Sequence, residues 1–132
     1  MERAGLFVDI ANLFNCVQQV HDGARLDFEK YLAKCREHYE VVRAFAYGTQ
    51  IKEEATKFIH KLKHLGYDVK YNRPRVIRNT DGEIERVNHT DWSVGLTVDI
   101  IRNLQRLDVV IFGSSNRVLV PCVNYLKERG IK

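Results

Sequence analysis

Apolar and polar residues alternate along this chain in a way that predicts strands separated by helices. Short apolar segments predict four strands, one that ends at Asp9 and three more at residues 41–47, 67–71 and 108–112. Gly48 is expected to end the second of these strands. Apolar residues at helical spacing predict helices at residues 11–20, 28–39, 52–65, 91–104 and 118–129. Strands joined by helices predict an α/β domain with a mostly parallel sheet and helices on both faces.

One segment departs from this alternation. Residues 73–87 form two strand-like runs around Asp81 and Gly82, a pair that predicts a β-hairpin. The chain stops at Lys132, where another strand is expected to begin. We expect residues 1–132 to form a single domain. A chain that stops where a strand is expected to begin is also typical of a piece of a longer protein.

Composition narrows the class of protein. The 132 residues suffice for one domain with a core, and 45% apolar with 29% charged residues is typical of a soluble globular protein. Neither a membrane span nor a signal peptide is evident, so we expect a cytoplasmic protein. Cys16, Cys35 and Cys122 are far apart and odd in number, which is typical of thiols in a reducing compartment. The net charge of +4 is a mild bias toward nucleic acid.

Polar residues stand at three places where strands end or helices begin. Asp9 and Asn12 follow the first strand, residues 88–93 open the fourth helix, and residues 113–116 follow the last strand. Right-handed crossovers bring these places to one edge of a parallel sheet. Carboxylate, amide and hydroxyl oxygens suit Mg²⁺, which could orient a water and neutralise charge on a phosphodiester. This pattern predicts a metal-dependent phosphodiester site.

Each of these residues also has a simpler interpretation. Asp9 could serve only to cap the first helix, and Thr90 or Asp91 the fourth. The turn at residues 113–116 could bind a phosphate through backbone N–H groups without any catalysis. Asp99 lies about 12 Å along a helix from Asp91 and about 80° around it, so a straight helix cannot direct both at one ion. Pairing with a neighbouring base is the alternative for Asp99.

Basic residues gather near the predicted hairpin and the last turn. The hairpin arginines are Arg73, Arg75, Arg78 and Arg86. Arg117 flanks the last turn, and Tyr71 and Trp92 lie nearby in sequence. Guanidinium groups bind phosphates and aromatic rings stack on unpaired bases, which favours a single-stranded nucleic acid. The alternative is that these charges serve only solubility. His60 and His64 have ligand spacing on a helix, but no third ligand lies near them in sequence.

These residues together resemble the NYN family of PIN-like nuclease domains. The opening motif of that family, close to V-D-x-x-N, is matched by residues 8–12. Its middle motif, D-W-D-V-G-L-A-V-D, is similar to residues 91–99, and its late motif, S-G-D-S-D-F-x-P-L, is similar to residues 114–122. Order and spacing match over nearly the whole chain. The resemblance implies a PIN-like three-layer α/β/α domain with a mostly parallel central sheet.

The departures from the family pattern fall where its acids stand. Ser93, Asn116 and Val118 each replace an acid of the family motifs. The resemblance implies RNA cleavage with Mg²⁺ or Mn²⁺, whereas these substitutions remove about half of the negative charge that would hold the metal. Asparagine and serine can still coordinate through neutral oxygens, but valine cannot.

The leading hypothesis from the sequence is a metal-dependent ribonuclease. Its candidate residues are Asp9, Asn12, Asp91 and Asn116 for catalysis, Asp9, Asp91 and Asp99 as metal ligands, and Arg75, Arg78, Trp92, Ser114, Ser115 and Arg117 for binding RNA. The first alternative is an NYN domain that has lost catalysis and binds RNA or a protein partner. The second is a phosphatase-like enzyme for a small phosphorylated substrate. A homodimer is a further possibility for the oligomeric state.

Overall fold

The computed structural model describes residues 1–13, 27–49, 54–72, 75–88 and 91–132, without the side chains of residues 54–55, 75–76 and 85–88. The strands are β1 (Arg3–Asp9), β2 (Glu40–Thr49), β3 (Asp68–Asn72), β4 (Arg75–Arg78), β5 (Ile84–Asn88) and β6 (Val109–Gly113). The helices are α2 (Phe28–His38), α3 (Glu54–Leu65), α4 (Ser93–Asn103) and α5 (Val120–Glu128). The 3₁₀ turn η1 (Leu104–Arg106) follows α4, and the 3₁₀ turn η2 (Arg117–Leu119) precedes α5. Residues 10–13 are helical, and the rest of the first predicted helix lies outside the description.

Four parallel strands form the central sheet in the order β3-β2-β1-β6. β1 lies inside the sheet, where Phe7 is paired with Phe45 of β2 on one side and with Phe112 of β6 on the other. Phe7 and Val8 are fully buried, as a strand covered on both faces requires. The predicted mostly parallel α/β sheet is confirmed.

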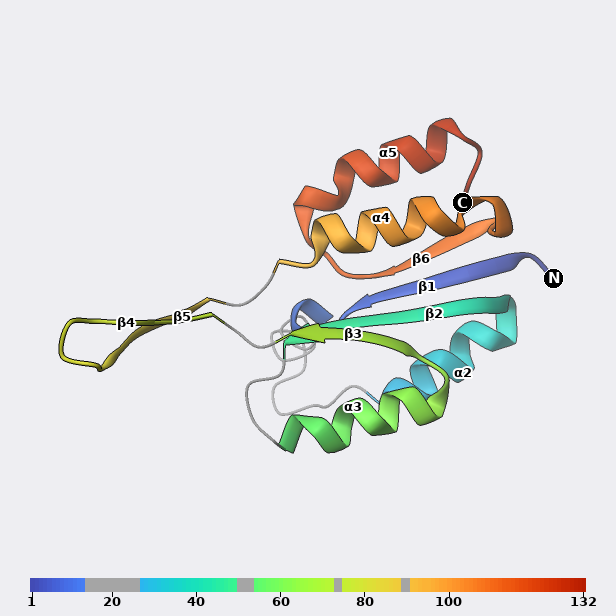
Figure 1. Cartoon of the computed structure of the whole chain (residues 1–132). Helices are drawn as coiled ribbons and strands as arrows, with labels where there is room; N and C mark the ends of the chain where they lie inside the picture. The colour runs from blue at the N-terminus through green and yellow to red at the C-terminus, as the bar shows by residue number, and fades with distance from the viewer. Residues whose placement is uncertain (14–26, 50–53, 73–74, 89–90) are drawn as a thin grey trace.

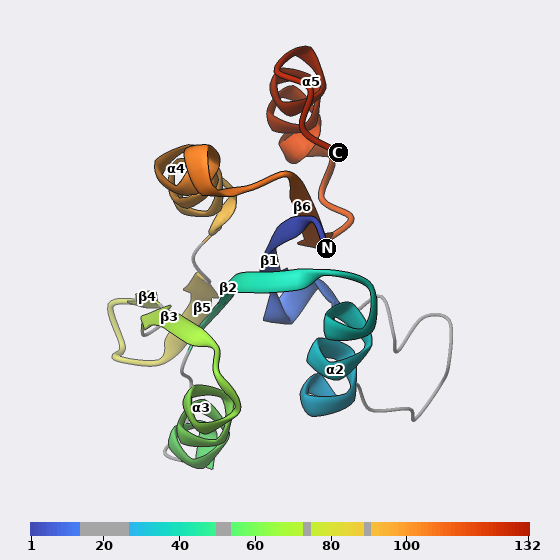
Figure 2. The same cartoon turned by 90° about the vertical axis from the view of Figure 1, so that its right-hand side faces the viewer.

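Helices cover both faces of this sheet. Figure 2 shows α2 and α3 on one face and α4 and α5 on the other. Successive β1 side chains point to opposite faces, so Leu6 and Val8 pack toward α2 and α3 while Phe7 packs toward α4 and α5. The resulting three-layer α/β/α architecture is the one that the family resemblance implies.

Gly48 does not end β2, so that prediction from the sequence is wrong. The strand continues through Gly48, which pairs with Tyr71, to Thr49, which pairs with Asn72. A Cβ atom at position 48 would lie 3.2 Å from Cδ1 of Ile10. The glycine therefore gives Ile10 room beside the strand.

The predicted hairpin is confirmed as the antiparallel pair β4 and β5. Asn79 Oδ1 accepts hydrogen bonds from the N–H groups of Asp81 and Glu83, both at 3.0 Å, and Gly82 has a φ of 82°. A positive φ favours glycine there. Figure 1 shows the hairpin projecting beyond the carboxyl ends of the sheet strands.

Both termini lie at the opposite, amino edge of the sheet (Figure 1). The Val110 N–H donates to the Lys132 carbonyl at 3.0 Å, and the Lys132 N–H donates to the Asp108 carbonyl at 3.2 Å. The last residue thus lies beside β6, where the sequence predicts the start of another strand. In the part of the chain that the structure covers, no helix has the length and apolar character needed to cross a bilayer.

Candidate nucleic-acid site at the carboxyl edge of the sheet

Three segments far apart in sequence meet at the carboxyl edge of the sheet. They are the end of β1, the start of α4 and the loop after β6. Asn12 Oδ1 accepts hydrogen bonds from the Ser115 N–H at 2.8 Å and from the Ser115 hydroxyl at 3.3 Å. The Asn116 amide Nδ2 donates to Ser93 Oγ at 3.1 Å. The structure therefore brings the segments singled out in the sequence into contact.

Asp9 is half-buried at the end of β1. Burial raises the pKa of its carboxyl above the usual value, and the negative charge of Asp91 raises it further, while hydrogen bonds from the backbone N–H groups of Asn12 and Ala11 oppose the shift. The Asn12 N–H donates to Asp9 Oδ1 at 3.2 Å, which is a capping contact. Asp9 thus accepts a capping hydrogen bond and is also close enough to Asp91 for the two carboxyl groups to repel each other.

Asp91 lies just before α4 and is exposed. Its Oδ1 accepts a hydrogen bond from the Ser93 N–H at 2.9 Å. Hydrogen bonds from the Ser93 hydroxyl and backbone N–H lower the pKa of the Asp91 carboxyl, so it is ionised at neutral pH. The carboxylate therefore stabilises the first turn of α4 and places a negative charge at this edge of the sheet.

Ser93 and Asn116, two of the residues that replace family acids, form a neutral pair. Ser93 is buried, with 9% of its surface exposed. Asn116 donates to the Ser93 hydroxyl and also accepts, at Oδ1, a hydrogen bond from the Val118 N–H at 3.2 Å, which caps η2. Two carboxylates at this separation would repel each other, whereas serine and asparagine join α4 to η2 directly.

Asp99 points away from this pair, toward the sheet. It is 5% exposed, and Lys70 Nζ donates to its two oxygens at 2.8 and 2.7 Å. The Tyr47 hydroxyl donates to Asp99 Oδ2 at 2.8 Å. This contact with a base is the alternative that the helix geometry left open, and it separates Asp99 from the other predicted metal ligands.

The predicted RNA-binding residues have different surroundings. The Trp92 indole N–H donates to the Gly48 carbonyl at 3.0 Å, and its ring packs on Tyr47 with centroids 5.7 Å apart. Arg78 donates to the Gly82 carbonyl within the hairpin at 3.1 Å.

The other candidates stand at the loop after β6, apart from Arg75, whose side chain lies outside the described residues. Ser114 Oγ accepts a hydrogen bond from the Asn116 N–H at 3.2 Å, and the Ser115 N–H and hydroxyl both bind Asn12. Arg117 is exposed in η2, directly after the neutral pair. Among these residues, Arg117 presents a cationic side chain to solvent at the site.

A cleft of about 420 Å³ between α4 and α5 adjoins the neutral pair. Its lining is Asp91, Ser93, Val94, Thr97, Val98, Val118, Pro121 and Cys122. Val94 is 77% exposed and Val118 58% exposed. The sequence analysis missed this cleft, although Val94 and Val98 are four residues apart and therefore share a face of the helix. A mostly apolar cleft with a few polar groups is typical of a ligand site.

The residues present do not fit the divalent metal that the family implies. Across the described ranges, no three His, Cys, Asp or Glu side chains are grouped so that they could hold a metal ion. Ser93 and Asn116 hydrogen-bond to each other, and Val118 has no oxygen in its side chain. Of the predicted metal ligands, Asp9 and Asp91 remain at this edge, and each accepts a hydrogen bond from a backbone N–H at the start of a helix.

The pKa shift of Asp9 makes a prediction for stability. A carboxyl whose pKa is raised by folding costs stability when ionised, and this cost disappears as the pH falls below the usual value near 3.8. We therefore expect Asp9→Asn to raise the melting temperature at pH 7 and to lose this advantage toward pH 3, as measured by circular dichroism. Asp108→Asn is the control. Hydrogen bonds from Arg3 lower the pKa of Asp108, so this substitution should lower the melting temperature at pH 7. Equal melting temperatures of Asp9→Asn and the native chain at pH 7 would contradict the prediction.

Comparison with known proteins agrees with this description. A crystal structure of a protein of unknown function, VPA0982 from Vibrio parahaemolyticus, superposes with a TM-score of 0.77 at 25% sequence identity, covering 99% of this chain and 77% of that chain. A search of curated proteins finds no significant match. The three-layer architecture with its parallel central sheet is of the PIN-like class of domains. The model of the NYN domain matches residues 3–132, so the chain belongs to the NYN domain family.

Proposed function

We propose that this NYN domain binds single-stranded RNA in the cleft at the carboxyl edge and does not cleave it. The observation that carries the proposal is the hydrogen bond of 3.1 Å between Asn116 Nδ2 and Ser93 Oγ. These are two of the positions where the family has acids. A neutral pair lacks the negative charge that attracts a divalent cation. It also lacks a carboxylate that could act as the base for an attacking water.

The lining of the cleft supports binding of a nucleobase. Val94, Val98 and Val118 offer apolar surface to the face of an unpaired base, and Asp91 and Ser93 offer hydrogen-bonding atoms at one end. The volume of about 420 Å³ is in the range of small-ligand sites. Arg117 is exposed and precedes Val118 of the cleft lining, and in this proposal it contacts a phosphate of the same strand. Binding of RNA is also the general property of the NYN family.

A test of this proposal is the exposed side chain of Arg117. We expect Arg117→Glu to weaken binding of a fluorescein-labelled single-stranded RNA 12-mer by about tenfold, because one phosphate contact is replaced by repulsion. Fluorescence anisotropy in EDTA measures the affinity without any metal. Arg106→Glu is the matched control, since Arg106 is also an exposed arginine of a 3₁₀ turn but lies toward the amino edge. Equal losses in both variants would show that net charge, and not this site, governs binding.

The rival is the metal-dependent ribonuclease predicted from the sequence, with Mg²⁺ or Mn²⁺ as cofactor. One observation favours it: the charge of Asp91 reaches Asp9, so two carboxylates remain near each other. The discriminating test is incubation of the same RNA with Mn²⁺, Mg²⁺ or EDTA, using the native chain and Asp9→Asn. Under our proposal the RNA stays intact in every case. Cleavage that needs metal and disappears in Asp9→Asn would establish the ribonuclease.

A further inference from the structure

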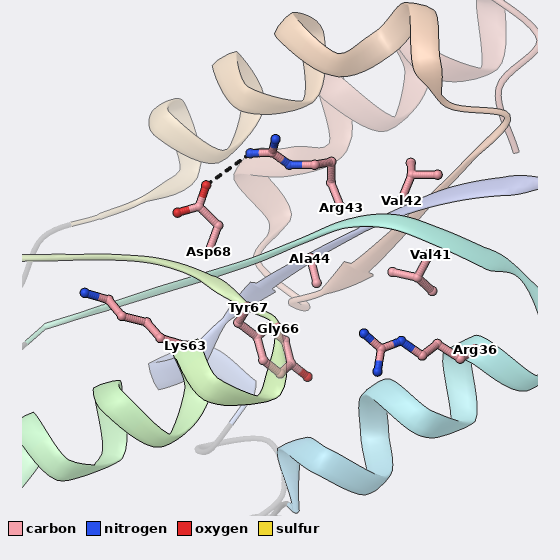
Figure 3. A pocket seen from close by; sticks show the side chains of 9 residues that line it. All are labelled: Arg36, Val41, Val42, Arg43, Ala44, Lys63, Gly66, Tyr67 and Asp68. Carbon is pink, nitrogen blue, oxygen red and sulfur yellow. Dashed lines mark hydrogen bonds and ion pairs between the residues drawn. The ribbon is translucent and has the colours of Figure 1, made fainter.

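A second cavity lies at the opposite end of the sheet from the proposed RNA site. Its volume is about 360 Å³. The lining comes from the end of α2, the first half of β2, Lys63 in the last turn of α3 and the turn from α3 into β3 (Figure 3). None of the lining residues belongs to the carboxyl-edge cleft.

The floor of this cavity is an open strand edge. β2 spans ten residues, but β3 pairs with it only from Phe45 to Thr49. On the other side, β1 pairs with β2 from Glu40 to Tyr47, with a shift of register at Val42. Within the described part of the chain, the stretch from Glu40 to Ala44 therefore has no neighbouring strand on the β3 side. At about 3.3 Å per residue, this edge is about 13 Å long.

The groups around this edge are mostly cationic. Arg43 is paired with Asp68 at 3.1 Å, and Figure 3 shows this pair on one side of β2. Arg36 approaches from α2 on the other side, where a Cβ atom at Gly66 would lie 3.3 Å from its guanidinium. Lys63 also lines the cavity. The Lys63 Nζ lies over the ring of Tyr71, 5.7 Å from its centroid. The lining thus holds three cationic residues and one carboxylate, so its net charge is positive.

We propose that this edge binds a short, extended acidic segment of a partner protein, which adds to β2 as a strand. An open edge supplies alternating N–H and C=O groups, and these match the backbone of a peptide and not the phosphates of RNA. The cations would then pair with carboxylates of the same segment. A second copy of this chain is a poor occupant, because its net charge is +4 and its own edge is equally basic.

The test is selection from a random heptapeptide library displayed on phage, with the native chain as bait. We expect enrichment of peptides with alternating acidic residues, and binding of a synthetic copy about tenfold or more weaker to the double variant Arg36→Glu, Lys63→Glu. The matched control is Lys30→Glu, Lys57→Glu, which makes the same charge change at exposed positions of α2 and α3 outside the cavity. Fluorescence anisotropy measures each affinity.

Four results would overturn the proposal. Enrichment of no acidic peptide, or equal binding to both double variants, would show that the cavity does not select such a segment. Loss of binding to the RNA 12-mer in Arg36→Glu, Lys63→Glu but not in the control would make the cavity an RNA-binding surface. Self-association of the native chain that this variant abolishes would make a second copy the occupant. RNA binding at the carboxyl edge is measured with separate variants, so the two proposals fail independently.

Discussion

Replacement of Ser93 and Asn116 by aspartate is expected to lower the melting temperature of the domain in EDTA and to make Mn²⁺ restore it. The double variant would place two new carboxylates beside Asp9 and Asp91, at positions where the native chain has a neutral hydrogen bond of 3.1 Å. Repulsion among them should lower the melting temperature by roughly 5–10 °C, the effect of about 2 kcal/mol in a domain of this size. Mn²⁺ at about 100 times its Kd would return about 2.7 kcal/mol.

The measurement is thermal unfolding by circular dichroism with EDTA or with Mn²⁺, together with calorimetric titration of the metal. The control is Ser93→Ala, Asn116→Ala, which removes the hydrogen bond without adding charge. We expect the control to lose about 1 kcal/mol of stability and to show no rescue by metal. If Mn²⁺ stabilises the native chain as much as the aspartate variant, the neutral pair has not removed the metal site.

The same variants also separate binding from cleavage. The native chain and the aspartate variant share the cleft and Arg117, so both should bind the RNA 12-mer, the aspartate variant more weakly in EDTA because its new carboxylates repel phosphates. If only the aspartate variant cleaves it, the two substitutions account for the loss of activity. If neither cleaves it, Val118→Asp is the next change to add, because Val118 stands at the third position where the family has an acid.

The sequence pattern predicted the fold well because β1, inside the sheet, is buried on both faces. Side chains of β1 such as Leu6 and Phe7 pack on opposite helix layers, so their run had to be apolar. The hairpin was predictable because Gly82 adopts a positive φ in its turn. Gly48 misled the prediction because its glycine leaves room for Ile10 within a continuing strand, a contact that no local pattern shows.

The site was predictable only as far as topology determines it. Parallel strands direct Asp9, Asp91 and Asn116 to one edge, so their convergence followed from the order of elements. Their hydrogen bonds did not follow, because they depend on how α4 is rotated over the sheet. That rotation turns Asp99 toward Lys70 on β3, 29 residues earlier in the chain. It also fixes Trp92, which the sequence presented as an RNA-stacking residue, against the Gly48 carbonyl.

Loss of Lys70 should destabilise the domain strongly, since it would leave the Asp99 carboxylate buried without a cation. Lys70 Nζ lies 2.7 Å from Asp99 Oδ2, and the side chain of Asp99 is 7% exposed. Breaking such a pair from one side typically costs 3–5 kcal/mol, but Lys70 is itself 38% exposed and water can partly replace it. We therefore expect Lys70→Met to lower the free energy of unfolding by about 2–4 kcal/mol and the melting temperature by roughly 7–14 °C.

Urea unfolding of a double-mutant cycle tests this argument. Asp99→Asn in the Lys70→Met background should recover most of the lost stability, because the amide is neutral and its oxygen can still accept from Tyr47. An exposed pair serves as the control: Lys34 and Glu37 are 71% and 60% exposed, so Lys34→Met should change stability by less than about 0.5 kcal/mol. If Lys70→Met behaves like Lys34→Met, solvent and Tyr47 alone stabilise the Asp99 carboxylate. In that case the ion pair does not hold α4 to β3, and the position of Ser93 over the cleft depends on apolar packing instead.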